Sequence, residues 1–155
     1  MTTSDVQRSE LLFKLGMSYQ LLLAEFVSRM NEAGYGDLRP IHGYTFQILK
    51  DGGMTSSDLA QKLGITKQGS GQIVDYLAQR GYVERRPHPG GGRRKLIFVT
   101  DRGWEHLRTA GRLLHELEAE LAQHVGTSAM TELRAQLDTL LDTLGDDGTQ
   151  PFRPG

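Results

Sequence analysis

Two short helical patterns followed at once by two strand patterns constrain this sequence more than any other feature, and they fill residues 55–100. Each helical pattern follows a threonine that can cap it, Thr55 or Thr66, and the turn between them contains Gly64. The apolar residues recur at three- and four-residue steps: Leu59, Ala60, Leu63, Ile73, Val74 and Leu77. Two helices joined by so short a turn predict a helix-turn-helix.

A β-hairpin is predicted directly after the second helix. Tyr82–Arg86 alternates well enough for one strand, and Lys95–Val99 is rich in residues that favour the other. The six residues 87–92, PHPGGG, must turn. Because Pro87 and Pro89 cannot donate to a ladder, we expect short strand pairing and a long, flexible, basic tip.

The rest of the chain reads as helices around this unit. Apolar periodicity predicts helices over Ser9–Met30, Pro40–Leu49, a segment capped by Thr100 that runs to Val125, and a last segment, capped by Thr127 or Ser128, that ends before Gly145. The apolar stripes of the first and last helices are larger than a small domain can cover, which favours packing against a second copy of the chain; for the first helix alone, an ordinary core helix is the alternative. We expect residues 146–155 to form a mobile tail.

Charge separates the central segment from its flanks. Residues 55–100 carry eight basic and three acidic side chains, a net charge of +5, whereas the whole chain carries −1. A basic segment within an otherwise acidic chain indicates a surface that binds a polyanion, and the alternative is a solvated charged surface.

Composition excludes several other classes. The chain has 155 residues and no cysteine, which allows one substantial core and rules out disulfides and thiolate zinc sites. No apolar run approaches the roughly 20 residues that a membrane helix needs, and the N-terminus lacks the order of a signal peptide. We therefore expect a cytoplasmic protein without a membrane segment.

The order of these elements closely resembles the multiple-antibiotic-resistance regulator (MarR) family of dimeric winged-helix transcription factors. The likeness covers residues 11–144 and rests on several short motifs: Asp58-Leu59-Ala60, Leu63-Gly64, Val74-Asp75, Leu77, Arg80-Gly81-Tyr82-Val83, Arg85 and Thr100-Asp101-Arg102-Gly103. It implies a mainly α fold with a small β-hairpin wing (α+β). Residues 1–34 and 101–145 would form the helical dimerisation region, and residues 38–100 the winged helix-turn-helix.

The resemblance also implies a function. A homodimer would present two recognition helices to a palindromic operator on double-stranded DNA, with half-sites about one helical turn apart. Such a protein would regulate transcription, as a repressor, and would need no cofactor. The residues expected to contact DNA lie on the second helix of the helix-turn-helix and on the wing: Thr66, Lys67, Gln68, Ser70, Gln72, Arg85, Arg86, Arg93, Arg94 and Lys95.

Two regions depart from the family pattern, the wing tip and the recognition helix. At the wing tip, where the family carries an Asp that orients an arginine, this sequence has Gly91 and Gly92 before Arg93. The recognition helix has Gly69 and Gly71 where the family usually has residues with side chains. Each glycine costs a helix roughly 1 kcal/mol relative to alanine. Either the glycines let the helix backbone approach the groove closely, or they are mildly destabilising substitutions that the fold tolerates.

A regulatory ligand is a further implication of the resemblance, since family members often bind small aromatic or hydrophobic molecules. The residues that it suggests are Tyr19, Phe26, His42 and Tyr44, with Trp104 or His106 as additions. Each has a plainer role, because a Tyr or Phe at helical spacing is more often part of a core and a histidine often has only a structural partner.

Other functional classes have less support. No phosphate-binding GxxxxGK[ST] motif and no His-Glu metal spacing is present, so we predict neither an enzyme nor a metal site. The nearest approach to a metal cluster is His115 with Glu116, Glu118 and His124. A winged helix that binds protein or RNA is the alternative function, because a fold does not determine what it binds.

Overall fold

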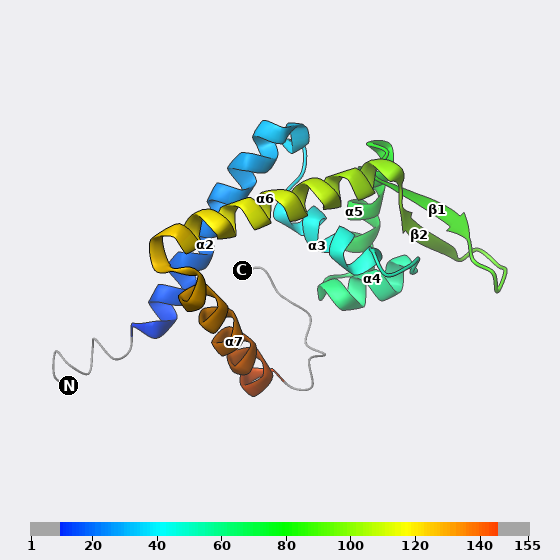
Figure 1. The fold of residues 1–155 in the computed structure, drawn as a ribbon. Helices are drawn as coiled ribbons and strands as arrows, with labels where there is room; N and C mark the ends of the chain where they lie inside the picture. Colours follow the sequence, from blue (N-terminus) through cyan, green and yellow to red (C-terminus); the bar gives the residue numbers. More distant parts are fainter. Residues whose placement is uncertain (1–9, 146–155) are drawn as a thin grey trace. The chain divides into compact units, whose positions relative to one another are not determined.

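The computed structural model describes residues 10–145 (Figure 1). The chain divides into two compact units, Met1–Asp37 and Leu38–Gly155, and each is described here by itself. The tail predicted for residues 146–155 lies outside the described residues.

The described part of the first unit, residues 10–37, is a single long helix and its exit. Helix α2 spans Leu11–Met30 and continues into a π-helical turn, η1, over Asn31–Tyr35. Gly34 has a φ of 100°, a conformation that glycine adopts without strain, and it ends the helical path. Large apolar side chains are exposed along most of α2: Leu11, Leu12, Phe13, Leu15, Met17, Tyr19, Leu21 and Leu22.

The segment Leu11–Tyr35 is long and apolar enough to cross a membrane, with a mean hydropathy of 1.2. This corrects the expectation that no segment has that length and composition. The helix also carries charges, with Glu25 accepting a hydrogen bond of 2.9 Å from Arg29 one turn later. A helix that packs against another protein surface passes the same test, so length and composition do not by themselves make this segment a membrane span.

The second unit contains the remaining helices and a two-stranded sheet. Helices α3 (Pro40–Leu49), α4 (Ser56–Leu63) and α5 (Lys67–Gln79) precede strands β1 (Val83–Pro87) and β2 (Lys95–Val99). Helices α6 (Asp101–Val125) and α7 (Thr127–Leu144) follow. In Figure 1 the hairpin extends as an arm away from α3, α4 and α5. The predicted class, mainly α with a small β-hairpin wing, is confirmed.

Threonine caps define the helix-turn-helix. Oγ1 of Thr55 accepts a hydrogen bond of 3.1 Å from the N–H of Asp58, and Oγ1 of Thr66 accepts one of 3.0 Å from Gly69. Each bond satisfies an amide that the first helical turn would otherwise leave without a partner. Gly64 ends α4 in the left-handed conformation, at φ 68° and ψ 33°. The sequence prediction of these caps and of this turn is confirmed.

One apolar core holds α3, α4, α5 and the base of the hairpin together. Its most deeply buried side chains come from all of these elements: Phe46, Leu49, Leu59, Leu77, Val74, Tyr82 and Ile97. The ring of His106, from α6, packs at 4.7 Å from the ring of Phe46. Burial of this kind contributes roughly 1.5–3 kcal/mol for each large apolar side chain, so the core determines where α5 lies.

The two strands pair antiparallel, with Val83 opposite Val99 and Pro87 opposite Lys95. Pro87 is therefore the last residue of β1 and not the first residue of the turn. A proline is tolerated there because its carbonyl can still accept a hydrogen bond, although it has no N–H to donate. Met54 adds a short third element, donating to the carbonyl of Ile97 at 3.3 Å and accepting from its N–H at 2.8 Å. This bridge, which the sequence analysis did not predict, ties the loop after α3 to the wing.

Gly126 separates the last two helices. It has a φ of 94°, ends α6 and immediately precedes α7, which has no side-chain cap. The predicted capping role of Thr127 or Ser128 is therefore wrong, because α7 already begins at Thr127. Among the described residues of α7 none is buried, and Leu133, Leu140, Leu141 and Leu144 are exposed.

Candidate nucleic-acid interface

The N-terminal half of α5 presents a polar surface. Thr66, Lys67, Gln68 and Gln72 are exposed, while Val74 and Leu77 on the opposite side are fully buried. The cap at Thr66 and the buried residues together fix which side of α5 faces outward. Lysine and glutamine are side chains that donate to or pair with base edges in a DNA major groove.

Ser70 does not belong to that surface. Its side chain is fully buried, and its Oγ donates a 2.8 Å hydrogen bond to the carbonyl of Ser56 and accepts one of 3.2 Å from the Ser56 hydroxyl. Ser70 thus fastens α5 to the start of α4. We correct its predicted role accordingly, because a hydroxyl held between two helices cannot reach a base edge.

The two glycines of α5 have different surroundings. A Cβ atom added to Gly69 would lie 3.2 Å from Oγ1 of Thr66, so a side chain there would crowd the helix cap. A Cβ atom added to Gly71 would have nothing within 4 Å. The chain's own packing therefore accounts for a glycine at position 69 but not at position 71.

Arg85, on β1, forms an ion pair with helix α5. Its Nη2 lies 2.5 Å from Oδ1 of Asp75 on α5, and the two side chains are 36% and 62% exposed. At that exposure an ion pair contributes little to stability, but it links the wing to α5. The guanidinium stays at the surface, where it can still contact a phosphate.

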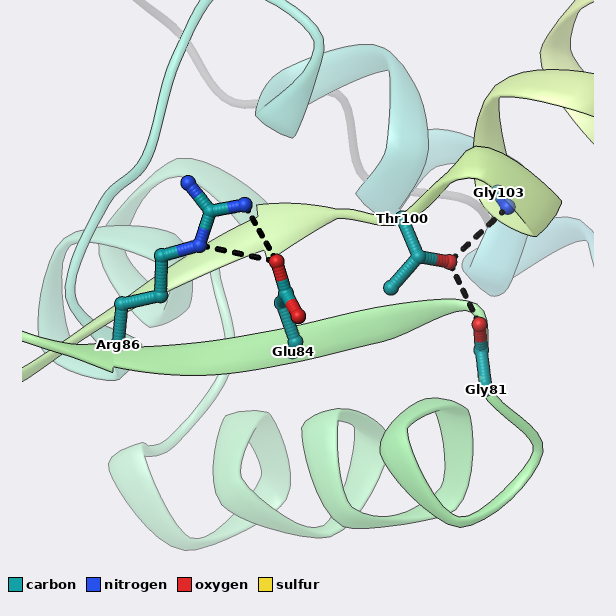
Figure 2. A network of polar contacts seen from close by, with 5 residues as sticks. All are labelled: Gly81, Glu84, Arg86, Thr100 and Gly103. Atoms are coloured by element: carbon teal, nitrogen blue, oxygen red, sulfur yellow. Dashed lines mark hydrogen bonds and ion pairs between the residues drawn. The ribbon is translucent and has the colours of Figure 1, made fainter.

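Arg86 is held within the wing itself. Its Nε donates a 2.9 Å hydrogen bond to Oε1 of Glu84, and its Nη2 reaches the same oxygen (Figure 2). The guanidinium also lies 4.4 Å from the ring centre of Phe98. Phe98 in turn covers Gly53, where a Cβ atom would approach the ring to 2.3 Å. Arg86 therefore has a defined position rather than a freely solvated one.

The wing tip is an ordered turn. The N–H of His88 donates to the carbonyl of Arg94 at 3.1 Å, which extends the ladder one residue beyond Pro87. Gly91 and Gly92 then reverse the chain with φ values of 77° and 78°. Arg93, Arg94 and Lys95 follow directly and are all exposed. Backbone hydrogen bonds thus close the loop, and the expected flexibility of the tip stays a prediction.

Hydrogen bonds of Thr100 connect the base of the wing to α6. Its Oγ1 donates a 2.5 Å hydrogen bond to the carbonyl of Gly81 and accepts one of 3.3 Å from Gly103 (Figure 2). Gly103 must be a glycine, since a Cβ atom there would lie 2.4 Å from the carbonyl oxygen of Tyr82. The cap is predictable from local sequence, whereas this close approach depends on the three-dimensional packing.

The residues suggested for ligand binding lie in both units. Tyr19 and Phe26 are on α2, whereas His42 and Tyr44 are on α3. His42 is 6% exposed, accepts a 2.8 Å hydrogen bond from the N–H of Arg39, and stacks on Tyr76 at 4.8 Å. It therefore has a capping and packing role in α3.

Two further aromatic residues were candidates for the same ligand. His106 is buried against Phe46 and Tyr82, and Trp104 is exposed near the start of α6. The predicted ligand pocket stays a prediction.

No group of three or more metal-ligating side chains occurs within residues 10–145. Two of the acidic residues considered for such a group have basic partners instead. Glu116 pairs with Arg112 at 2.9 Å, and Glu118 on α6 pairs with Arg134 on α7.

Comparison with known proteins identifies related sequences. A sequence model described as MarR family matches residues 37–94, which include the whole helix-turn-helix and most of the wing. An uncharacterised HTH-type transcriptional regulator of Mycobacterium bovis, Mb0904, is 31% identical over 94 residues, covering 61% of this chain and 66% of its own length. The transcriptional repressor MprA of Escherichia coli is 27% identical over 143 residues, covering 89% of this chain and 81% of its own length.

Solved structures share the fold. RV1404 from Mycobacterium tuberculosis superposes with a TM-score of 0.77 at 22% identity, covering 94% of this chain and 97% of its own. A mutant of MarR from Escherichia coli, complexed with operator DNA, gives 0.68 at 19% identity over 87% and 96% of the two chains. NadR in complex with 4-hydroxyphenylacetate gives 0.60 at 21% identity over 83% and 89%.

These matches agree with the motifs and the geometry. The related sequences are named as transcriptional regulators, in line with the prediction that the chain is not an enzyme. The matched part of the chain spans 66% of the Mycobacterium bovis relative, just under two thirds of that protein. The elements present, helix-turn-helix, wing and long terminal helices, are those on which the sequence resemblance rested. Residues 37–94 match the MarR family, and the longer similarity is to proteins named as transcriptional regulators.

Proposed function

We propose that the protein is a cytoplasmic, sequence-specific repressor that binds a palindromic operator as a homodimer. The observation that carries the proposal is the juxtaposition of a polar, exposed face on α5 with a basic wing, in a chain whose residues 37–94 match the MarR family. The recognition helix would read bases, and the wing would anchor the protein on the flanking DNA.

The N-terminal half of α5 is suited to the major groove. Lys67 can donate to guanine, and Gln68 and Gln72 can each pair with both edge positions of adenine. Thr66 and the first backbone amides of α5 suit a phosphate, because the positive end of the helix dipole lies there. Ser70 is not part of this proposal.

The wing would contribute affinity. Arg93 or Arg94 would enter the flanking minor groove, where a narrow groove concentrates negative potential. Arg85, Arg86 and Lys95 would contact phosphates, which strengthens binding on any sequence and makes it dependent on salt. The MarR structure with the same fold is complexed with operator DNA, which supports DNA as the partner of this fold.

The exposed apolar faces support the proposed homodimer. Helices α2 and α7 expose leucines along their length, and α7 buries none of its residues within the described chain. An apolar surface of this extent indicates a protein interface, and a second copy of the chain would cover it symmetrically. Light scattering is expected to give twice the chain mass of 17.2 kDa at micromolar concentration, and a monomer would contradict the proposal.

A small aromatic ligand would release the protein from DNA. The fold is shared with NadR in complex with 4-hydroxyphenylacetate, and Tyr19, Phe26 and Tyr44 are the aromatic residues that the sequence suggests for contacts with such a ligand. His42 is left out because its ring and Nδ1 are already engaged. Ligand binding would act by favouring a dimer state with lower affinity for DNA. An aromatic acid such as 4-hydroxyphenylacetate should then weaken operator binding, and no change would remove this part of the proposal.

Selection of bound sequences from a random DNA pool tests the central activity. Recovery of an inverted repeat with half-sites about one helical turn apart is expected. The selected duplex should bind more tightly than a scrambled one, with affinity falling steeply as salt rises. Equal binding of both duplexes would overturn the operator proposal, and binding without salt dependence would favour a protein partner.

A further inference from the structure

We infer that His88 positions the wing tip for DNA, in place of the acidic residue that this wing lacks. The inference rests on the proposed function, because it concerns how Arg93 and Arg94 reach the DNA. In the MarR-like pattern an Asp near the end of the tip orients an arginine, and here Gly91 and Gly92 occupy that part of the loop. His88 lies on the other side of the same loop, at the end of β1.

His88 makes hydrogen bonds through its backbone and its side chain, all within the tip. Its N–H donates to the carbonyl of Arg94 at 3.1 Å, and its own carbonyl accepts from the N–H of Gly91 at 2.9 Å. Its imidazole Nδ1 accepts from the N–H of Gly90 at 2.9 Å. The first bond closes the loop across the hairpin. The other two hold the two glycines that lead into the turn.

The guanidinium of Arg94 lies beside this imidazole. A Cβ atom added to Gly90 would be 3.0 Å from Nη2 of Arg94 and also 3.0 Å from Nδ1 of His88. Both side chains therefore converge on the same glycine, which has room for them only because it has no side chain. The position of Arg94 depends on the turn that His88 holds, so we expect the two residues to act together.

The chemistry of the bond defines a matched pair of substitutions. Because Nδ1 accepts, the proton of the neutral imidazole is on Nε2. Asparagine can accept from the N–H two residues later with its side-chain oxygen, as it does in many turns. Leucine has nearly the same size but no acceptor. His88→Asn should therefore keep the turn, and His88→Leu should lose it, without either substitution removing an arginine.

DNA binding by the full-length variants forms the first part of the test, with the duplex selected for the wild-type protein. His88→Leu should weaken binding by about 2- to 10-fold, as expected for loss of one hydrogen bond, and His88→Asn should bind within about 2-fold of wild type. In an Arg94→Ala background, His88→Leu should cost less than about 2-fold, because the two residues act as a unit. Equal losses in both backgrounds, or no rescue by asparagine, would overturn the inference.

The heteronuclear NOE of the Gly90 and Gly91 amides in the free protein forms the second part. Both amides should be rigid in the wild type and in His88→Asn, and should become mobile in His88→Leu. This readout requires no DNA, so it separates the two proposals. If the wild type does not prefer its selected duplex, the proposed function fails even where the NOE contrast is present. If the NOE values do not differ between the variants, the inference fails even where operator binding is intact.

Discussion

The recognition helix and the wing differ in what holds their functional side chains in place. Helix α5 is held on its inner side by buried Val74 and Leu77 and by the Ser70 hydroxyl, which bonds to the start of α4. These contacts fix which side of α5 faces outward. The wing is thin, and its basic side chains are placed by contacts at the surface, such as those of Arg85 with Asp75 and of Arg86 with Glu84.

This difference separates two properties of DNA binding. A rigid helix with a small number of polar side chains can discriminate between bases, because a misplaced hydrogen bond there cannot relax. A wing positioned by solvent-exposed contacts can adjust to the backbone and contributes mostly through charge. We therefore assign sequence preference to α5 and general affinity to the wing. Substitutions that alter the support of one region at a time can separate the two contributions.

Removal of the support beneath α5 should have the largest effect. Leu77→Ala leaves a cavity under the recognition helix, and we expect the free energy of unfolding to fall by about 2–5 kcal/mol. Urea denaturation at one fixed protein concentration measures this loss, since a dimer's stability depends on concentration. The matched control is Gln79→Ala on the exposed side of α5, which should change stability by less than about 0.5 kcal/mol. Similar losses for both variants would show that the core does not fix α5.

Crowding at the base of the wing should have the next largest effect. Gly103→Ala places a Cβ atom against the carbonyl of Tyr82, and the resulting shift should cost about 1–3 kcal/mol of stability. Gly111→Ala, at an open position in the same helix, should instead stabilise the protein by about 0.5–1 kcal/mol. Thermal unfolding of the two variants gives the comparison. A neutral Gly103→Ala would contradict the close packing of α6 on the wing.

Gly71→Ala should change stability and DNA binding in opposite directions. Nothing lies near the added methyl group in the free protein, so the helix should gain about 0.5–1 kcal/mol. If the backbone of α5 approaches the groove closely at this position, the same methyl group should weaken operator binding. Unfolding and fluorescence anisotropy on one preparation measure both quantities. Unchanged affinity would leave Gly71 as a tolerated substitution without a role in recognition.

The ion pair between the two regions should matter least for stability. Asp75→Asn frees Arg85, and because both side chains are substantially exposed we expect less than about 1 kcal/mol of change. Binding to scrambled DNA should become tighter, since a negative charge is lost beside the proposed interface. Glu105→Gln, an exposed position on α6, provides the charge control. Equal gains for both variants would point to net charge rather than to the link between α5 and β1.

The elements that depend on local chemistry could be predicted from the sequence. Thr55 and Thr66 cap their helices, and Gly64 turns between them, because capping depends on residues only a few positions apart. The apolar spacing of α4 and α5 likewise predicted which sides are buried. The family resemblance added the wing and the order of the long helices.

What depends on tertiary contacts could not be predicted. Ser70 has a side chain that could contact a base, but it is buried because α4 packs against it. Residue spacing within α5 cannot predict that α4 lies there. Two prolines and three consecutive glycines predict a turn, but not the hydrogen bonds of His88 that close it, because these require the folded hairpin. The bridge from Met54 to Ile97 joins residues too far apart in sequence for periodicity to reveal.

The assignment of sequence preference to α5 and of general affinity to the wing is tested most directly by comparing Gln72→Ala with Arg93→Ala. Both variants are titrated against the selected operator and against a scrambled duplex at the same salt concentration. We predict that Gln72→Ala loses about 1–3 kcal/mol of preference for the operator while its binding to scrambled DNA is unchanged. Arg93→Ala should weaken binding to both duplexes by a similar factor. Preserved preference in Gln72→Ala together with abolished preference in Arg93→Ala would contradict the account.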